Sequence, residues 1–453
     1  MPRSPDGREA GESAHVRSAA PGPAPRSGRN PWWIPPFLGG VPPVPPDVLR
    51  LLGLVSLALF FESYDLSMLT SALHYIARDL GLDAHDMGAT LGLVRLGALP
   101  AFLLIPLADR VGRRRLFLAS ILGISAFTFF TAFATTPAQF VVLQMIARTF
   151  MVTAMSCAVV IVTEEFPAEH RGWGIGMMGA LAACGVGFGA LLFSLIDVLP
   201  YGWRALYAFG VAPVALFPLL RRGVRETARF ERSRARKAQS ETRAGLRGWL
   251  GPITTLVREH PGRTLGIAAI ALLAAAGSAP VFQFTGYFVQ TAHGWAPWQY
   301  STLVIAGGAI GILGNVIAGR LGDRVGRRRV GFTVMSLFPV FAFAFYHGPG
   351  WLVPLSWVLF VLCETALRTI TRAVATELFP TAVRGTATGW GALLEMVGAA
   401  LGLAILGVGT EAPADIAFMT SVLALALVGA GVVLLLLPET GSRELEAISR
   451  DGA

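Results

Sequence analysis

The chain has 453 residues, of which 54% are hydrophobic and only 14% are charged, whereas soluble domains carry about 25% charged residues. Its net charge is +9, but the basic residues are arginines except for one lysine, and they stand between apolar runs. This placement argues against a soluble enzyme or a nucleic-acid-binding domain, and it predicts a membrane protein with no nucleic-acid partner.

The N-terminal segment 1–46 is rich in Pro, Gly, Ser and Arg and has no apolar run that resembles a secretory signal, so we expect a disordered tail. Beyond it, apolar runs long enough to cross a hydrocarbon layer of about 30 Å recur along the chain. The predicted spans are 49–73, 87–108, 116–134, 138–163, 172–197, 202–220, 264–290, 298–319, 331–346, 351–376, 386–409 and 414–437.

A polar, Arg-dense linker at 221–263 separates six spans from six. It divides the chain into an N-terminal half, 47–220, and a C-terminal half, 264–437, and a short tail, 438–453, follows. The fold expected from this pattern is an all-α membrane protein of twelve transmembrane helices in two halves of six.

Arginines mark alternate loops of this pattern. The loops at 109–116 and 320–330 are Arg-rich, whereas the opposite side carries only Arg78 and Arg204. Cytoplasmic loops of membrane proteins carry an excess of Lys and Arg. The pattern therefore predicts a protein of the inner (plasma) membrane, with both termini and the linker on the cytoplasmic side.

The two halves repeat short motifs at a nearly constant offset. "LADRVGRRR" at 107–115 matches "LGDRVGRRR" at 321–329, and "EEFPAEHRG" at 164–172 matches "ELFPTAVRG" at 377–385. Parallel repeats of six spans are a transporter architecture with the substrate site at the midplane between the halves.

These motifs resemble the major facilitator superfamily over residues 47–442, and within it the sugar-porter-like and metabolite:proton symporter branches. The resemblance implies two pseudo-symmetric halves and transport by alternating access. Two departures limit it: Ile105 stands where the first loop motif has Gly, and the seventh span carries Gln283, Tyr287 and Gln290 in place of the sugar porters' Gln-Gln…Asn pattern. A sugar is therefore not indicated.

Charged residues cluster at the Arg-rich ends of the spans. A carboxylate there can accept hydrogen bonds from a helix N-terminus and pair with Arg across the two halves. We predict a cytoplasmic gate made of Asp109, Arg113, Glu164, Arg171, Glu226, Asp323, Arg327, Glu377, Arg384 and Glu439.

Four acids and four arginines fall inside the predicted spans. Structural ion pairs are the simpler interpretation, but buried pairs are often no more stable than apolar packing, so we favour a wet cavity. The predicted cavity residues are Arg95, Gln283, Tyr287, Gln290, Glu364, Arg368, Arg372 and Glu395.

In proton-coupled members of the branch that the chain resembles, an Asp on the first span faces an Arg on the fourth, and Asp65 and Arg148 match those positions. We therefore predict proton coupling at Asp65 with Arg148, and Glu62 stays open as an alternative proton site. No metal site is predicted, and no cofactor apart from a proton as the coupling ion.

The sequence as a whole predicts a secondary transporter, not an enzyme, because no nucleotide-binding loop or catalytic motif is found in it. We expect a monomer in the lipid bilayer that moves a small organic solute by proton symport, with an organic anion favoured over a sugar. A proton-driven exporter is the nearer alternative, and a solute sensor that does not transport is the more distant one.

Overall fold

The computed structural model describes residues 34, 40–167, 169–226, 256–380 and 383–440. The predicted N-terminal tail, the central linker and the C-terminal tail fall largely outside these residues, so the segment boundaries stay predictions. Within the described residues, twelve helices are long and apolar enough to cross a membrane, and each coincides with a predicted span. The predicted fold class is confirmed.

The first half contains six spans and two short helices outside them. Its elements are α1 (Pro46–Ser71), α2 (Leu73–Leu80), α3 (Ala84–Leu96), α4 (Ala101–Leu104), η2 (Ile105–Leu107), α5 (Ala108–Val111), α6 (Arg113–Thr131), α7 (Pro137–Glu165), α8 (Arg171–Phe193), α9 (Trp203–Ala208), η3 (Phe209–Val211) and α10 (Ala212–Gly223). The second span comprises α3, α4 and η2, and the sixth comprises α9, η3 and α10.

The second half repeats this organisation. Its elements are α13 (Pro261–Gln283), α14 (Thr285–Ala292), α15 (Pro297–Val325), α16 (Arg327–His347), α17 (Val353–Glu377), α18 (Arg384–Val408), α19 (Asp415–Ala424) and α20 (Ala426–Leu436). The seventh span is broken between α13 and α14. A proline removes one helical hydrogen bond and displaces the preceding turn, and Pro280 lies one turn before the break.

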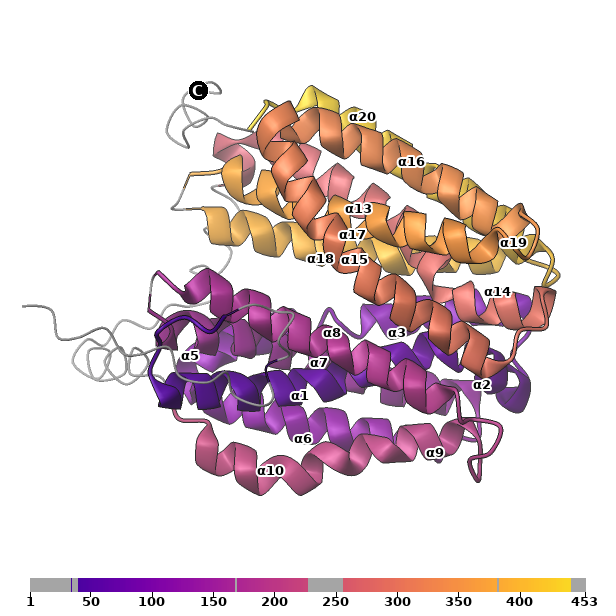
Figure 1. The fold of residues 1–453 in the computed structure, drawn as a ribbon, viewed down its shortest axis with the longest axis horizontal. Helices are drawn as coiled ribbons and strands as arrows, with labels where there is room; N and C mark the ends of the chain where they lie inside the picture. The colour runs from indigo at the N-terminus through magenta and orange to yellow at the C-terminus, as the bar shows by residue number, and fades with distance from the viewer. Residues whose placement is uncertain (1–33, 35–39, 168, 227–255, 381–382, 441–453) are drawn as a thin grey trace, which may run out of the picture.

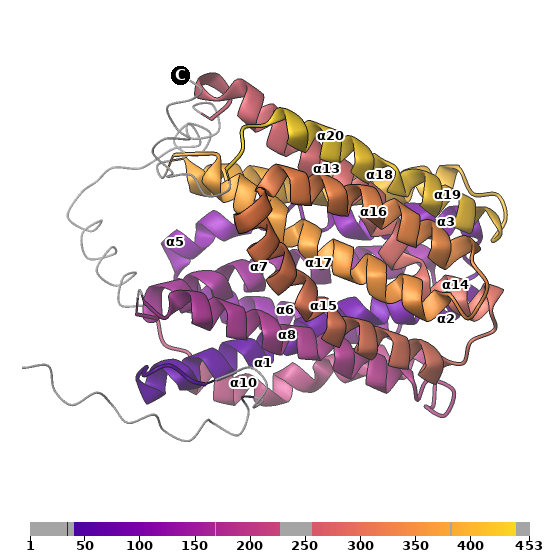
Figure 2. The ribbon, with the colours of Figure 1, turned by 45° about the horizontal axis from the view of Figure 1, so that its top comes forward.

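The halves form two helical bundles that lie side by side (Figure 1). The helix ends at loops 109–116 and 320–330 lie on the same side of the molecule, and we call this side the Arg-rich end (Figure 1). The opposite side, with α2, α9, α14 and α19, is the Arg-poor end. After a turn of 45° the two bundles overlap in part, and α15 of the second half passes in front of helices of the first half (Figure 2).

The two halves pack tightly against each other at the Arg-poor end. Helix α3 lies against α18 so closely that a Cβ atom added to Gly407 would stand 2.7 Å from the carbonyl oxygen of His85 and 3.2 Å from Cα of Gly88. Ser301 on α15 donates a hydrogen bond of 2.5 Å to the carbonyl oxygen of Ala190 on α8. We call this contact surface the seam.

Helix ends at the Arg-rich end are capped by glutamates from the same half. Glu439 accepts hydrogen bonds from the backbone N–H groups of Arg327 at 2.8 Å and Arg328 at 3.2 Å. Glu226 accepts one from the N–H group of Arg114 at 3.2 Å. A carboxylate at a helix N-terminus satisfies free donors and complements the helix dipole, so these two glutamates fix where α6 and α16 begin.

Candidate functional site

A cavity of about 600 Å³ lies between the halves, and most of its lining comes from α13, α17 and α18. The first half contributes Val159 from α7 and Ile175 from α8. From Ser278 and Glu364, deep in their helices, the lining continues to Thr376, near the end of α17. The cavity therefore extends from mid-membrane toward the Arg-rich end, whereas the seam closes the Arg-poor end.

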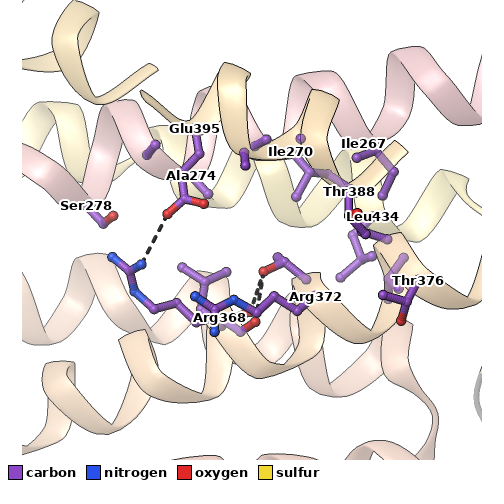
Figure 3. Close-up of a pocket in the computed structure, with 18 of the residues that line it drawn as sticks. Ile267, Ile270, Ala274, Ser278, Arg368, Arg372, Thr376, Thr388, Glu395 and Leu434 are labelled. Atoms are coloured by element: carbon purple, nitrogen blue, oxygen red, sulfur yellow. Dashed lines mark hydrogen bonds and ion pairs between the residues drawn. The ribbon is translucent and has the colours of Figure 1, made fainter. Parts of the chain in front are cut away.

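Three charged side chains cross this cavity. Glu364 and Arg368 are one turn apart on α17, and their Oε1 and Nε atoms are 2.8 Å apart. The Nη1 atom of Arg368 lies 3.1 Å from Oε1 of Glu395 on α18 (Figure 3). Arg368 is thus paired on both sides, and charge-assisted hydrogen bonds hold it in place. These three residues, predicted for a substrate cavity, lie in the lining of this one, and their role in substrate binding stays a prediction.

Arg372 lies one turn further along α17 and also lines the cavity (Figure 3). Its side chain is exposed and forms no ion pair within 4.0 Å in the described part of the chain. An unpaired guanidinium presents a planar donor set suited to a carboxylate. Across the cavity from α17, helix α13 offers an apolar wall of Ile267, Ile270, Ala271, Ala274 and Ala275, and Leu367 and Val374 of α17 add apolar surface beside the charged groups.

The apolar wall and Ser278 were not predicted as parts of the site. Ser278 lies in an Ala-rich stretch of α13, and neither charge nor spacing distinguishes it from packing residues in the sequence. The cavity lining therefore combines a predicted charged face of α17 with an unpredicted small-residue face of α13.

The three polar residues of the seventh span lie in the seam and do not line this cavity. Gln283 is 1% exposed, and its Nε2 atom donates to the carbonyl oxygen of Leu69 and to Oγ1 of Thr70, both at 3.3 Å. Gln290 donates to the carbonyl oxygen of Ser71 at 3.3 Å, and Tyr287 is buried beside them. They were predicted as cavity residues, but closure of the Arg-poor end brings them against α1.

Arg95 on α3 also contributes to the seam, because its Nη2 atom donates to Oε1 of Gln283 at 3.1 Å. It does not line the cavity. It lies close enough to Arg148, Arg368 and Glu395 for their charges to interact. Arg95 therefore interacts electrostatically both with Arg148 of the first half and with the charges of the cavity.

The predicted proton-coupling residues lie inside the first half, apart from the cavity lining. Asp65 is 3% exposed, and its Oδ1 atom has no hydrogen-bond partner among the described residues. Arg148 on α7 interacts electrostatically with both Glu62 and Asp65, although no described ion pair within 4.0 Å joins it to either carboxylate. The three predicted residues are thus brought together without direct pairing.

The predicted gate residues form ion pairs inside each half. Arg113 on α6 lies 3.4 Å from Glu164 on α7. Arg327 on α16 lies 2.9 Å from Asp323 and 3.0 Å from Glu377 on α17. The prediction had placed Arg pairing across the two halves, whereas these pairs join helices of one half.

The other predicted gate residues differ in their contacts. Two of the predicted carboxylates, Glu226 and Glu439, accept hydrogen bonds from the N-termini of α6 and α16. Arg171 and Arg384 stand at the first positions of α8 and α18, and each has a buried Nε atom without a hydrogen-bond partner in the described part of the structure. The side chain of Asp109 lies outside the described residues, and the gate itself stays a prediction.

Removing the amide of Gln283 tests the seam. We expect Gln283→Ala to weaken closure of the Arg-poor end, because the hydrogen bonds from Gln283 and Arg95 across the halves are lost, each worth about 1 kcal/mol. Labelling of a cysteine placed at Ser301 by an impermeant reagent should become faster. Tyr287→Phe is the matched control, because no described hydrogen bond involves its hydroxyl group. Equal labelling in both variants would contradict this role.

Comparison with known proteins finds a family model and several transporters that are similar to this chain. The family model described as Major Facilitator Superfamily matches residues 55–317 and 268–452. A gallate transporter of Pseudomonas putida is 27% identical over 403 residues, which cover 80% of this chain and 86% of that protein. A cis,cis-muconate transport protein of Acinetobacter baylyi is 26% identical over 368 residues, covering 78% and 85%.

Solved structures show the same fold. The crystal structure of a D-xylose-proton symporter aligns with a TM-score of 0.71 and 17% sequence identity. The alignment covers 87% of this chain and 99% of that chain. The helical arrangement of the two proteins is therefore alike over nearly their whole length.

Proposed function

Because the chain belongs to the Major Facilitator Superfamily, we propose that it imports small organic carboxylates across the plasma membrane together with protons. Like its family and relatives, the protein is a multi-pass membrane transporter and not an enzyme. The finer parts of the proposal concern the substrate, the orientation and the coupling ion.

The observation that carries the substrate class is the unpaired Arg372 opposite an apolar wall. An organic carboxylate can pair its charge with the guanidinium and place its carbon skeleton against Ile270, Ala274 and their neighbours. A sugar would leave that wall without a partner and the cation unmatched. The names of the relatives, a gallate transporter and a cis,cis-muconate transport protein, support the same class.

The orientation follows from the arginines. Loops rich in Arg lie on the cytoplasmic side of membranes, so we assign the Arg-rich end to the cytoplasm. In this orientation the cavity faces inward and the seam closes the outside. Alternating access then requires the seam to open while the halves close over the Arg-rich end.

Proton coupling is assigned to the group of Asp65, Glu62 and Arg148. Buried ionisable groups inside a membrane are costly and mark ion or proton pathways. Asp65 has the lowest exposure of the three and an unsatisfied carboxylate oxygen, a position where protonation relieves the cost of burial. Arg95 connects this group electrostatically with Arg368 and Glu395 at the cavity.

Uptake into proteoliposomes tests the proposal. Gallate, cis,cis-muconate and D-xylose are offered separately under an imposed pH gradient, acidic outside. We expect the two carboxylates to accumulate and D-xylose to stay out. Accumulation that needs the opposite gradient would make the protein an exporter, and uptake of D-xylose alone would overturn the substrate class.

Replacing Arg372 tests the carboxylate contact. We expect Arg372→Gln to raise the KM for gallate by about tenfold or more, because a hydrogen bond to a charged group is worth about 1.5–3 kcal/mol. Arg372→Lys keeps the charge and should retain part of the affinity. Unchanged KM in the Gln variant would show that the substrate binds elsewhere.

A further inference from the structure

A second pocket, of about 360 Å³, lies at the Arg-poor end. It is formed where α2 meets the turn that leads into α9. The lining residues are Tyr75, Arg78, Asp79, Tyr201, Gly202, Trp203 and Arg204. Three aromatic side chains and two arginines thus surround one small space outside the membrane spans that form the cavity.

The charge of the surrounding face makes this pocket unusual. The loops and short helices of the Arg-poor end contain six acidic residues, namely Asp79, Asp83, Asp86, Asp197, Glu411 and Asp415. The same segments contain only two arginines, Arg78 and Arg204, and both line the pocket. The two arginines of this face are thus gathered at one pocket, where Asp79 pairs with Arg204 and leaves Arg78 for an incoming anion.

Arg204 is held by several contacts. It forms an ion pair with Asp79, its Nη2 atom donates to the carbonyl oxygen of Ala134 at 2.8 Å, and its guanidinium lies 4.4 Å from the ring centroid of Trp203. The indole Nε1 of Trp203 donates to Oδ2 of Asp79 at 3.0 Å. These contacts fix one wall of the pocket.

Arg78 is the charge that remains available. It is exposed and forms no ion pair within 4.0 Å in the described part of the chain. Nearby, Tyr75 donates a hydrogen bond of 2.8 Å to Asp197, which fixes the position of that carboxylate and leaves its negative charge in place. Burial, and beside it the charge of Arg78, lower the pKa of His74, so His74 is neutral at neutral pH.

Tyr201 stands at the pocket in a strained backbone conformation. Its φ angle is 64°, a left-handed conformation that is uncommon for a bulky residue other than Gly. Its side chain is 85% exposed, so burial of the ring does not compensate for the strain. Strain of this kind clusters at ligand-binding sites, which makes the exposed ring a candidate contact for a flat ligand.

We propose that this pocket captures organic carboxylates at the outer face before they enter the transport path. This inference rests on the proposed function, which supplies the ligand class and the orientation. The carboxylate pairs with Arg78, and the carbon skeleton of the ligand packs on the ring of Tyr201. The site increases the occupancy of substrate beside the entrance and takes no part in the central cavity.

The pocket is adjacent to the seam through which such a ligand has to pass. The ring of Tyr75 contacts Phe193 with centroids 6.0 Å apart, and Phe193 contacts Tyr300 of the second half at 6.1 Å. The imidazole of His74 lies 5.9 Å from the ring of Tyr287. Two rings, Tyr75 and Phe193, thus connect the pocket with Tyr300 on the surface that opens in the outward-facing state.

Initial rates of gallate uptake by proteoliposomes test the capture site. We expect Arg78→Gln to raise KM about two- to fivefold, since an exposed ion pair is weak, and to leave the maximal rate unchanged. The difference in KM between this variant and the wild type should disappear at high salt, because salt screens the attraction between Arg78 and the carboxylate in the wild type. Tyr201→Gly should also raise KM while it relieves the backbone strain. Glu411→Gln, a charge change of the same size on the same face, is the control and should not raise KM.

Binding measured without transport separates this inference from the proposed function. Saturation-transfer NMR on the protein in nanodiscs uses gallate as the probe and the Arg372→Gln variant as the background. A signal that Arg78→Gln removes supports the capture site even if no uptake occurs. A signal that persists in the Arg78→Gln variant would overturn the capture site, because gallate would then bind elsewhere. Displacement of gallate by inorganic phosphate at equal concentration would also overturn it and would assign the pocket to phosphate groups.

Discussion

Asp65→Asn is expected to abolish accumulation of substrate under a pH gradient and to leave exchange of labelled for unlabelled substrate intact. Asparagine has the shape of a protonated aspartate but cannot release a proton. Asp65 is 3% exposed, and asparagine has almost the same volume as aspartate, so the neutral side chain should fit without loss of folding. Exchange needs only the movement of the loaded carrier, whereas accumulation needs the proton.

The measurement is the ratio of internal to external gallate in proteoliposomes. One pH unit is equivalent to about 1.4 kcal/mol, or tenfold accumulation per proton carried with one substrate. The Asn variant should equilibrate without concentrating gallate. Glu62→Gln is the matched variant on the same helix: if it loses accumulation and Asp65→Asn does not, the proton site is Glu62. Normal accumulation in both would show that this helix does not couple protons.

Gly407→Leu is expected to stop transport by keeping the seam from closing. Gly407 faces the backbone of α3, and even a Cβ atom would lie 2.7 Å from the carbonyl oxygen of His85. Overpacking of this kind costs about 1–3 kcal/mol. That energy shifts a two-state equilibrium by about 5- to 150-fold, here toward the state that is open at the Arg-poor end.

Labelling kinetics and transport together test this prediction. A cysteine at Ser301, which is 3% exposed in the closed seam, should react with an impermeant reagent much faster in the Leu variant. Cys157, Cys184 and Cys363 are first replaced by Ala, because none of the three forms a disulfide bond in the described part of the chain and each could react with the reagent. Gly179→Leu is the control, since a Cβ atom at Gly179 meets nothing within 4 Å. Wild-type transport by Gly407→Leu would show that the seam does not limit the cycle.

The fold was predictable because a bilayer imposes a simple rule on sequence. Backbone polar groups must be satisfied inside each segment, so every span has to be a long apolar helix, and hydropathy locates it. The break between α13 and α14 needed more than hydropathy. Pro280 indicates an irregularity, but the apolar run continues through it, so the sequence predicted one continuous span.

The site was predictable where helix geometry alone decides. Glu364 and Arg368 are four residues apart, so they share a face of α17 and form the 2.8 Å pair. Gln283 was predicted with the cavity because polar residues at helical spacing indicate an inter-half surface. Such a surface becomes seam or cavity depending on which end is closed, and sequence does not specify the conformation.

The seventh span takes part in both surfaces. Its α13 segment lines the cavity as far as Ser278, and the next turns, from Gln283 on, belong to the seam. Thermodynamic reciprocity then applies: a ligand that shifts the seam must have its own affinity shifted by the same factor when the seam is altered. Substitutions at Gln283 or Gly407 should thus change equilibrium binding of gallate at a cavity that neither residue touches. The ratio of the gallate affinity of the variant to that of the wild type reports how far the balance between inward and outward states has moved.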